Sequence, residues 1–433
     1  MRIWPCAAIN DKPIPRVDAH TRIHPFLWPA PPQDKETTFV NAAIVIPSYW
    51  TDETAEVHTP GAYDHATPLS QTRPDLESCL SSLEQVRDCP TIIVLAVCPI
   101  SATADVARRV RQICDAHRSL DICVVTNIEA AQIIDRVSEI APRGTGECIS
   151  LRGYGAIRNM GLACAAVLGR SAVIFLDDDE RVIGPDFVQK ALYGLGQQTR
   201  QGLPILVKSG YFYDRAGSPM APTDKVGICH RWWTKRIEFN RWMKRALEGT
   251  RISRSNYVCG GCMALHARAF MRVAFDPYIT RGEDLDYLFN MRMMGYDVWF
   301  DNQWSVRHLP PQIEQRSPRF MQDVYRWYYE RAKLRHASRQ PDLNPVTPAG
   351  LMPYPGPWIS NELDERVRKT AMVRTFFTRE HAGYFHIWKH GRAEAERYAR
   401  ENQGQYLRFQ SFWPKIMDGL WGDIKLSSML KGK

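Results

Sequence analysis

The sequence predicts an α/β protein whose mostly parallel sheet is flanked by helices and followed by a mainly helical C-terminal extension. Two observations support this prediction. Short apolar runs alternate with segments of helical spacing through the first 200 residues or so, and strands that alternate with helices of this length favour a parallel sheet. From about residue 315 helical spacing dominates the rest of the chain.

Each element follows from its own pattern of apolar residues. The apolar runs expected to form strands are 42–50, 91–97, 120–127, 172–176, 204–211, 258–265 and 297–301. Within the first run, the strand is expected to end at Pro47. The expected helices are 76–86, 104–117, 153–169, a helix opened by Pro185, 236–247 and 281–294. Proline is favoured in the first turn of a helix, which supports the start at Pro185.

Three regions are expected along the chain. Residues 1–40 are proline-rich and aperiodic, as in an arm that lies over the body of the protein. Residues 41–312 hold the alternating strands and helices and form the predicted main domain. Residues 313–433 form the helical region, interrupted by a proline-rich loop at 341–358. The polar stretch 51–74 lacks periodicity, and a loop of this length is usually functional or disordered.

Composition narrows the class of protein. The 433 residues are 44% hydrophobic and 24% charged, as in ordinary soluble globular proteins, and no apolar run reaches the length of a membrane span. The start of the chain lacks the apolar core of a signal peptide, so we expect a cytoplasmic protein with reduced thiols. Residues 311–433 contain 21 Lys and Arg against 13 Asp and Glu, which is +8 of the total net charge of +9. This balance suits an anionic ligand or surface.

Four consecutive acids follow the predicted strand at 172–176: Asp177, Asp178, Asp179 and Glu180. Ligands of an open α/β sheet bind beyond the carboxyl ends of its strands, where these acids stand. Carboxylates are suitable ligands for Mg²⁺ or Mn²⁺, which also take up substrate phosphates. The alternative is a solvated acidic turn that stabilises the start of the next helix.

Two further patterns add to this one. Glu283 and Asp284 open a predicted helix, where a carboxylate held near an electrophile can deprotonate a hydroxyl. His308 ends another short strand and can offer a neutral imidazole to a metal ion. Each also has a structural alternative, since acids stabilise helix starts and a lone histidine is more often a structural residue.

Taken together and in order, these motifs resemble the GT-A fold nucleotide-sugar glycosyltransferases, most closely the inverting glycosyltransferase family 2. The resemblance covers roughly residues 42–310. It rests on AIVIPSYW, GYGAIRNMGL, VIFLDDDERV, CGGCMALHARAF, RGEDLDYLFNMRMMGYDVWF and His308.

The resemblance implies an enzyme of the EC 2.4 class that moves a sugar from a nucleotide-diphosphate donor to an acceptor hydroxyl. The implied metal ligands for Mn²⁺ or Mg²⁺ are Asp179, His308 and Asp177. The implied donor-binding residues are Pro47, Ser48, Tyr49, Arg158, Asn159, Asp177 and Asp178. Asp284 would be the general base and Glu283 its neighbour at the acceptor, with Trp304, Arg281 and Trp233 on the acceptor side.

Of the four acids we expect Asp177 and Asp179 to be the functional pair. Asp178 and Glu180 either tune the site or are simply solvated, and we favour solvation. The family's acidic D-D-G-S-type turn after the second strand is missing, because no acid precedes Asp105 there. Recognition of the base must therefore differ, although a UDP-sugar remains the default donor.

Other functions remain open at this point. A retaining glycosyltransferase has the same fold, and a nucleotidyltransferase also holds metal at a strand end. The second normally needs a glycine-rich phosphate loop, which PSYWTDETAE does not supply. A non-catalytic binding protein would not need all four of Asp177, Asp179, Asp284 and His308. No nucleic acid partner is expected, and the acceptor is a carbohydrate, a lipid-linked sugar or a small molecule.

The C-terminal segment YLRFQSFWPKIMDGLWGDIKL predicts an amphipathic helix with a break at Pro414. One face carries large apolar residues, with Lys415 and Lys425 beside them. This face suits peripheral contact with an anionic membrane, on its cytoplasmic side. The alternative is a final helix packed against the domain.

Overall fold

The computed structural model describes residues 41–52, 66–223, 227–310 and 316–432. The predicted arm at 1–40 and most of the predicted loop at 51–74 lie outside these residues. The strands are β1 Ala42–Thr51, β2 Thr67–Pro68, β3 Thr91–Val97, β4 Ile122–Val125, β5 Ala172–Phe175, β6 Glu180–Val182, β7 Val207–Tyr213, β8 Ile252–Arg254, β9 Met263–His266 and β10 Trp299–His308. They form one sheet in the order β4-β3-β1-β5-β9-β7-β10-β6, with β2 on β1 and β8 on β10.

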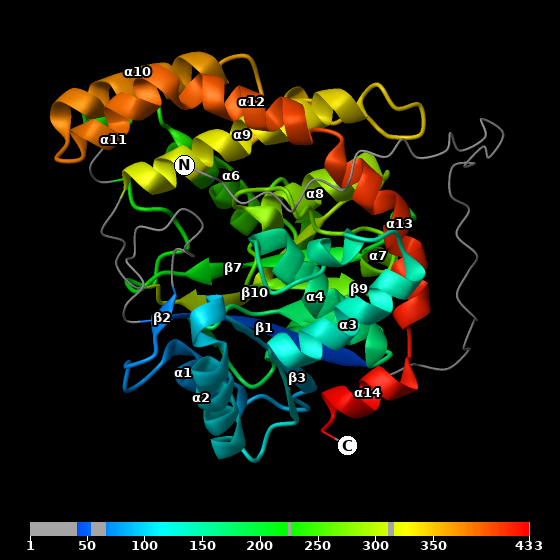
Figure 1. Ribbon diagram of the computed structural model, residues 1–433. Coiled ribbons are helices and arrows are strands. Elements are labelled where there is room, and N and C mark those ends of the chain that lie inside the picture. The colour runs from blue at the N-terminus through cyan, green and yellow to red at the C-terminus, as the bar shows by residue number, and fades with distance from the viewer. Residues whose placement is uncertain (1–40, 53–65, 224–226, 311–315, 433) are drawn as a thin grey trace.

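Helices cover both faces of this sheet (Figure 1). The helices of the N-terminal two thirds are α1 Asp75–Leu83, α2 Thr103–Ala116, α3 Asn127–Ile140, α4 Tyr154–Val167, α5 Phe187–Leu192, α6 Lys235–Glu248, α7 Ala267–Phe270 and α8 Glu283–Met293. The helices of the C-terminal third are α9 Ser317–Ala337, α10 Leu363–Phe377, α11 His381–His386, α12 Arg392–Asn402, α13 Gln405–Leu420 and α14 Ile424–Leu430.

Because side chains alternate along a strand, the strands contribute to two apolar cores, one on each face of the sheet. Ala43 and Val45 of β1 pack into a core with side chains of α3, α4 and α8. Ile44 and Ile46, which point to the other face, pack with side chains of α1, α2 and α5. Because each face of the central strands is covered, these strands read as continuous apolar runs in the sequence. The predicted fold class, a mostly parallel sheet flanked by helices with a helical C-terminal part, is confirmed.

The helical C-terminal part shares the first of these cores. Val324 and Trp327 of α9, and Trp413 of α13, belong to the same buried cluster as Val45 of the central strand. The proline-rich loop at 341–358 also contributes, since Leu351 is fully buried there. The expected boundary at residue 312 therefore marks a change of secondary structure within one continuous core.

Two element ends that were predicted at prolines are wrong. β1 continues through Pro47 to Thr51, because the ladder to β5 ends at Val45 and the missing N–H of Pro47 removes no bond on that side. Helix α13 likewise continues through Pro414. Helix α3 was not predicted, although Thr126 and Glu129 form a capping box at its start, a signal present in the sequence. The short helix α7 was not predicted either.

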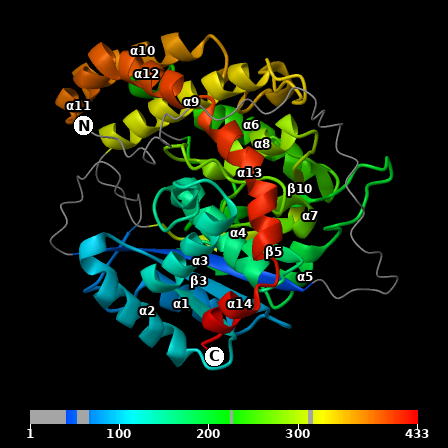
Figure 2. The same ribbon diagram turned by 45° about the vertical axis from the view of Figure 1, so that its right-hand side comes forward.

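Of the two alternatives for the C-terminal segment, the structure has the helix packed against the domain. Helix α13 runs along the flank of the sheet domain (Figure 2), and Phe409, Trp413, Ile416 and Leu420 are fully buried there. The indole of Trp413 donates a hydrogen bond of 2.8 Å to the carbonyl of Phe270. The apolar face thus packs against the domain. Among the described residues, no helix is both long enough and apolar enough to cross a membrane.

Candidate functional site

The four acids lie where the sheet brings the ends of β1 and β5 together. These two strands are parallel neighbours, so Ser48 and Tyr49 of β1 reach the same edge as the turn that follows β5. The Ser48 hydroxyl donates to the Asp178 carboxylate over 2.8 Å, and the backbone N–H of Tyr49 donates to the same oxygen over 3.2 Å. The acidic turn is thereby fixed to the central strand.

The short strand β6 connects this turn to His308. β6 pairs antiparallel with the end of β10, where His308 stands opposite Glu180. The Nε2 atom of His308 lies 3.2 Å from the Asp179 carboxylate. Burial lowers the pKa of His308, but the hydrogen bond and charge of Asp179 outweigh it, so the pKa is raised overall. An imidazole and a carboxylate separated by 129 positions in the sequence thus lie in direct contact.

Asp178 and Glu180 are not solvated, contrary to our expectation. Their exposed fractions are 3% and 2%, whereas the side chain of Asp177 is 30% exposed. Glu180 accepts a hydrogen bond of 3.2 Å from the backbone N–H of Asp177. Burial and the neighbouring carboxylates raise the pKa of both Asp178 and Glu180. All four carboxyl groups are therefore crowded together at one strand end.

Arg158 of α4 joins the acidic turn to the start of α8. Its guanidinium donates to Asp177 over 2.8 Å and to Glu283 over 3.1 Å. Only 4% of its side chain is exposed. Burial opposes the charge, but Asp177 and Glu283 outweigh it and raise the pKa of Arg158. Its Nη1 atom is buried and has no hydrogen-bond partner among the described residues.

Glu283 and Asp284 differ in their surroundings although they are adjacent. Glu283 is 6% exposed, and burial raises its pKa while Arg158 opposes the shift. Asp284 is partly exposed and accepts a hydrogen bond of 3.2 Å from the backbone N–H of Gly260. Asp284 is therefore the more accessible of the two carboxylates at the start of α8.

Glycines allow the surrounding segments to approach closely. Gly282 has a φ of +70°, and a Cβ there would overlap the guanidinium of Arg326 on α9. A Cβ on Gly261 would overlap the Glu180 carboxylate. Neither Arg326 nor Gly261 was among the site residues predicted from the sequence. The motifs RGED and CGGC indicated that these segments belong to the site, but the contacts of Gly282 with Arg326 and of Gly261 with Glu180 depend on the tertiary fold.

The donor set fits a divalent cation that is bound partly by its substrate. Asp179 and His308 supply a carboxylate and an imidazole at one point, and Asp177 stands two residues from Asp179. Among the described residues, no group of three or more His, Cys, Asp and Glu side chains is already arranged to hold a metal. Mg²⁺ binds through one or two carboxylates plus phosphate oxygens and water, which a site with two protein ligands allows.

Three predicted site residues make contacts within the protein. The side-chain amide of Asn159 is occupied by backbone groups of Cys148 and Phe275, so it fixes α4 to the chain rather than facing a donor. Trp304 is fully buried, with its ring beside Phe187. Trp233 packs edge-on against two aromatic rings, Phe320 and Trp358. The residue type alone did not show whether these side chains pack within the protein or bind a ligand.

Two other predicted residues remain near the site. Pro47 is buried within β1, directly before the Ser48 and Tyr49 groups that bind Asp178. Arg281 precedes the start of α8 and forms an ion pair of 3.1 Å with Asp323 of α9. The sequence therefore identified correctly which segments meet, but not which side chains are engaged in structural contacts.

No protein-family model matches the sequence, and no curated protein matches it. Among solved structures, the chain is similar to the mannosyltransferase PcManGT from Pyrobaculum calidifontis in complex with GDP-Man and Mn²⁺, with 12% identity, 90% of this chain and 88% of that chain covered, and a TM-score of 0.43. It is also similar to GalNAc-T7 with UDP, GalNAc and Mn²⁺, with 13% identity, 71% and 52% coverage and a TM-score of 0.42.

A third similar structure is glucosyl-3-phosphoglycerate synthase from Mycobacterium tuberculosis in complex with Mg²⁺ and UDP. The identity is 14%, the coverage is 64% of this chain and 72% of that chain, and the TM-score is 0.32. At these identities and scores the function has to be argued from the residues of this chain.

Proposed function

We propose that the protein is a metal-dependent, inverting glycosyltransferase of the EC 2.4 class, which transfers a sugar from a nucleotide-diphosphate donor, by default a UDP-sugar, to an acceptor hydroxyl. One observation carries the proposal. Arg158 binds both the acidic turn and the start of α8, so two separate predicted motifs share one site. A sugar transfer needs both a place for the diphosphate and a base, which these motifs supply.

Asp179 and His308 would hold Mn²⁺ or Mg²⁺, with Asp177 at the exposed side of the turn. A bound divalent cation neutralises the diphosphate and so stabilises it as the leaving group. Charged side chains of the protein keep the acidic turn in position. Arg158 balances Asp177 and Glu283 and keeps the turn in place, and Asp178 anchors the turn to β1 through Ser48.

Asp284 would act as the general base. It is the partly exposed member of the pair, and the Gly260 N–H orients its carboxylate without neutralising it. It would take the proton from the acceptor hydroxyl as that oxygen attacks the anomeric carbon on the face opposite the nucleotide, which inverts the anomeric centre. Glu283 is held by Arg158 and would position the start of α8.

Reduced thiols agree with the cytoplasmic location that we propose. The ten cysteines within the described residues are free, and Cys259 and Cys262 have pKa values raised by burial. Thiols of this kind are unreactive structural groups.

A thermal-shift panel tests the donor. UDP-, GDP-, CDP- and dTDP-sugars are each added with Mn²⁺, and the correct donor is expected to raise the melting temperature, because a ligand of the native state stabilises it by mass action. Proton NMR of the product formed with the donor so identified then gives the anomeric configuration. No shift with any of the four donors would refute the donor class, and retention of configuration would refute inversion.

A further inference from the structure

Exposed aromatic side chains gather at one end of the molecule. Among the described residues, Phe376, Phe377 and Phe385 are 68%, 63% and 48% exposed. Trp388 connects two of them, since its ring lies 6.2 Å from that of Phe376 and 6.0 Å from that of Phe385, and Phe377 adjoins Phe376 in the sequence. Most of the other exposed large apolar residues stand singly on separate elements. Contiguous exposed apolar surface of this kind usually marks an interaction site.

These side chains belong to helices that are already packed on their inner side. Tyr384 and Ile387, which neighbour Phe385 and Trp388 in sequence, are only 2% and 3% exposed. A helix that is apolar on opposite sides is normally covered on both. In Figure 1, α10, α11 and α12 lie together at the end of the molecule away from α1, α2 and α14. Their outer side is therefore the side without a cover among the described residues.

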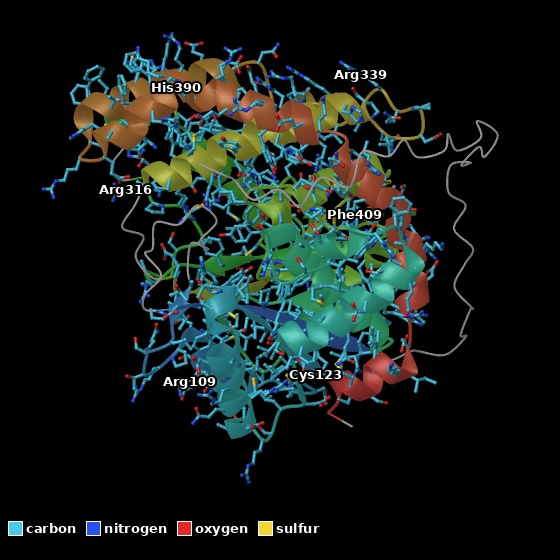
Figure 3. The ribbon with its side chains drawn as sticks, viewed as in Figure 1. Arg109, Cys123, Arg316, Arg339, His390 and Phe409 are labelled. Carbon is cyan, nitrogen blue, oxygen red and sulfur yellow. The ribbon has the colours of Figure 1, made fainter. Side chains whose placement is uncertain are left out.

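The sequence around these rings is basic, although Lys369 pairs with Glu365, Arg392 with Asp364 and Glu396, and His386 with Glu394. Residues 368–392 contain six Lys and Arg and a single acid, Glu380. The Glu380 carboxylate is turned toward α9, where it accepts hydrogen bonds from the backbone N–H groups of Arg316 and Ser317. The ammonium of Lys389 lies 4.2 Å from the centre of the Trp388 ring. Exposed histidines, including His390 (Figure 3), stand in the same stretch.

We propose that this aromatic–basic patch (Phe376, Phe377, Arg379, Phe385, Trp388 and Lys389) docks the protein on the surface of an anionic lipid bilayer. The aromatic rings enter the headgroup region, and the cations bind lipid phosphates. An aromatic surface with few acids and several cations is complementary to such a bilayer. A protein partner would have to be acidic and apolar at once to match it. The proposal does not depend on the chemistry of the candidate site.

The patch is rigidly connected to the candidate site. Glu380 caps α9 at Ser317, and Gly383 packs so closely on Ser317 that a Cβ there would overlap its hydroxyl. Asp323 of the same helix forms an ion pair of 3.1 Å with Arg281, two residues before the start of α8. Docking at α10 and α11 would therefore hold the site at a fixed distance from the bilayer. It replaces the apolar face of α13, which is buried, as the membrane contact.

Vesicle sedimentation with the full chain tests the proposal. The probes are vesicles of equal parts phosphatidylglycerol and phosphatidylcholine, and vesicles of phosphatidylcholine alone. We expect binding to the anionic vesicles that falls at least tenfold in 0.5 M NaCl, because lipid charges are screened. The double variant Phe377→Ser/Phe385→Ser and the charge variant Arg379→Glu/Lys389→Glu are each expected to lose binding about tenfold or more.

Matched controls separate the patch from general stickiness. Trp421→Ser/Ile424→Ser removes exposed apolar side chains near the C-terminus, and Arg108→Glu reverses a charge on α2, the helix that carries Arg109 at the opposite end in Figure 3. Both controls should bind like the unmodified protein. Equal loss in the controls, absence of binding to anionic vesicles, or a dimer in light scattering that the patch variants dissociate without any vesicle binding would each overturn the proposal. All variants are checked for an unchanged melting temperature.

Discussion

Two buried cations, Arg158 and Lys333, each bind two carboxylates, yet their surroundings differ. Lys333 of α9 donates to Asp276 over 2.8 Å, to Asn290 over 3.0 Å and also to Asp286, and all of these side chains are fully buried. Tyr329 donates a further bond of 2.7 Å to Asp276. Burial raises the pKa of Asp286 to about 6 even with Lys333 beside it.

Around Arg158 the polar groups are not balanced in this way. Three more acids, Asp178, Asp179 and Glu180, crowd the turn, and Asp177 remains partly exposed. The Nη1 atom of Arg158 has no hydrogen-bond partner in the part of the chain that the structure describes. A buried ion cluster by itself therefore indicates little about function. A saturated cluster without solvent access fixes α9 to α8, whereas excess charge and open hydrogen-bonding capacity suit a ligand.

The largest effect is expected from Asp284→Asn. Removal of a general base lowers transfer by about 10²- to 10⁴-fold, while the melting temperature stays nearly unchanged because Asp284 is partly exposed. The initial rate of product formation checks the first part and thermal unfolding the second. Asp418→Asn, which removes a surface partner of Arg272, should leave both unchanged. Equal transfer rates for Asp284→Asn and the unmodified protein would contradict the assignment.

Lys333→Met should lower the stability of the protein, whereas Asp284→Asn lowers its activity. Lys333→Met leaves Asp276 and Asp286 buried without their cation, a change that typically lowers the free energy of unfolding by about 3–5 kcal/mol. Urea unfolding measures the loss. Lys369→Met, at a surface pair with Glu365, should cost at most about 0.5 kcal/mol. A small effect of Lys333→Met would show that the cluster is not the structural counterpart of the Arg158 site.

The smallest effect concerns the pH dependence of stability. Burial and neighbouring acids raise the folded-state pKa of Asp178 and Glu180 above their unfolded values. These groups therefore destabilise the folded protein at neutral pH. As the pH falls through the folded-state pKa values, the two groups take up protons in the folded protein but remain ionised in the unfolded protein, so the destabilisation decreases. Asp178→Asn/Glu180→Gln should be more stable than the unmodified protein at pH 8 by about 1 kcal/mol, and the difference should shrink at pH 5.

This comparison is made by urea unfolding without divalent cations. The single variants Asp178→Asn and Glu180→Gln show whether one acid dominates. A difference that grows toward pH 5 would mean that the two carboxylates are stabilised by charge in the folded protein, contrary to their crowded surroundings.

The sequence predicted the central strands and the segments of the site because these depend on local patterns. The apolar runs at β1, β3 and β5 and the acids after β5 were sufficient. Burial of Asp178 and Glu180 was not predictable, since it depends on Ser48, β6 and Gly261 meeting in space. The roles of Asn159 and Trp304 were missed for the same reason. Helix α3 is different, because its capping box at Thr126 was visible in the sequence.

The central claim is that the acidic turn and His308 bind a divalent cation together with a nucleotide diphosphate. Isothermal titration of UDP, with and without Mn²⁺, tests it most directly, using the unmodified protein and Asp179→Asn. GDP replaces UDP if the donor panel favours guanosine. We expect nucleotide binding that requires Mn²⁺ and is weakened at least tenfold by Asp179→Asn, with an unchanged melting temperature in the absence of ligand. Nucleotide binding that is independent of Mn²⁺ and equal in both proteins would contradict the claim.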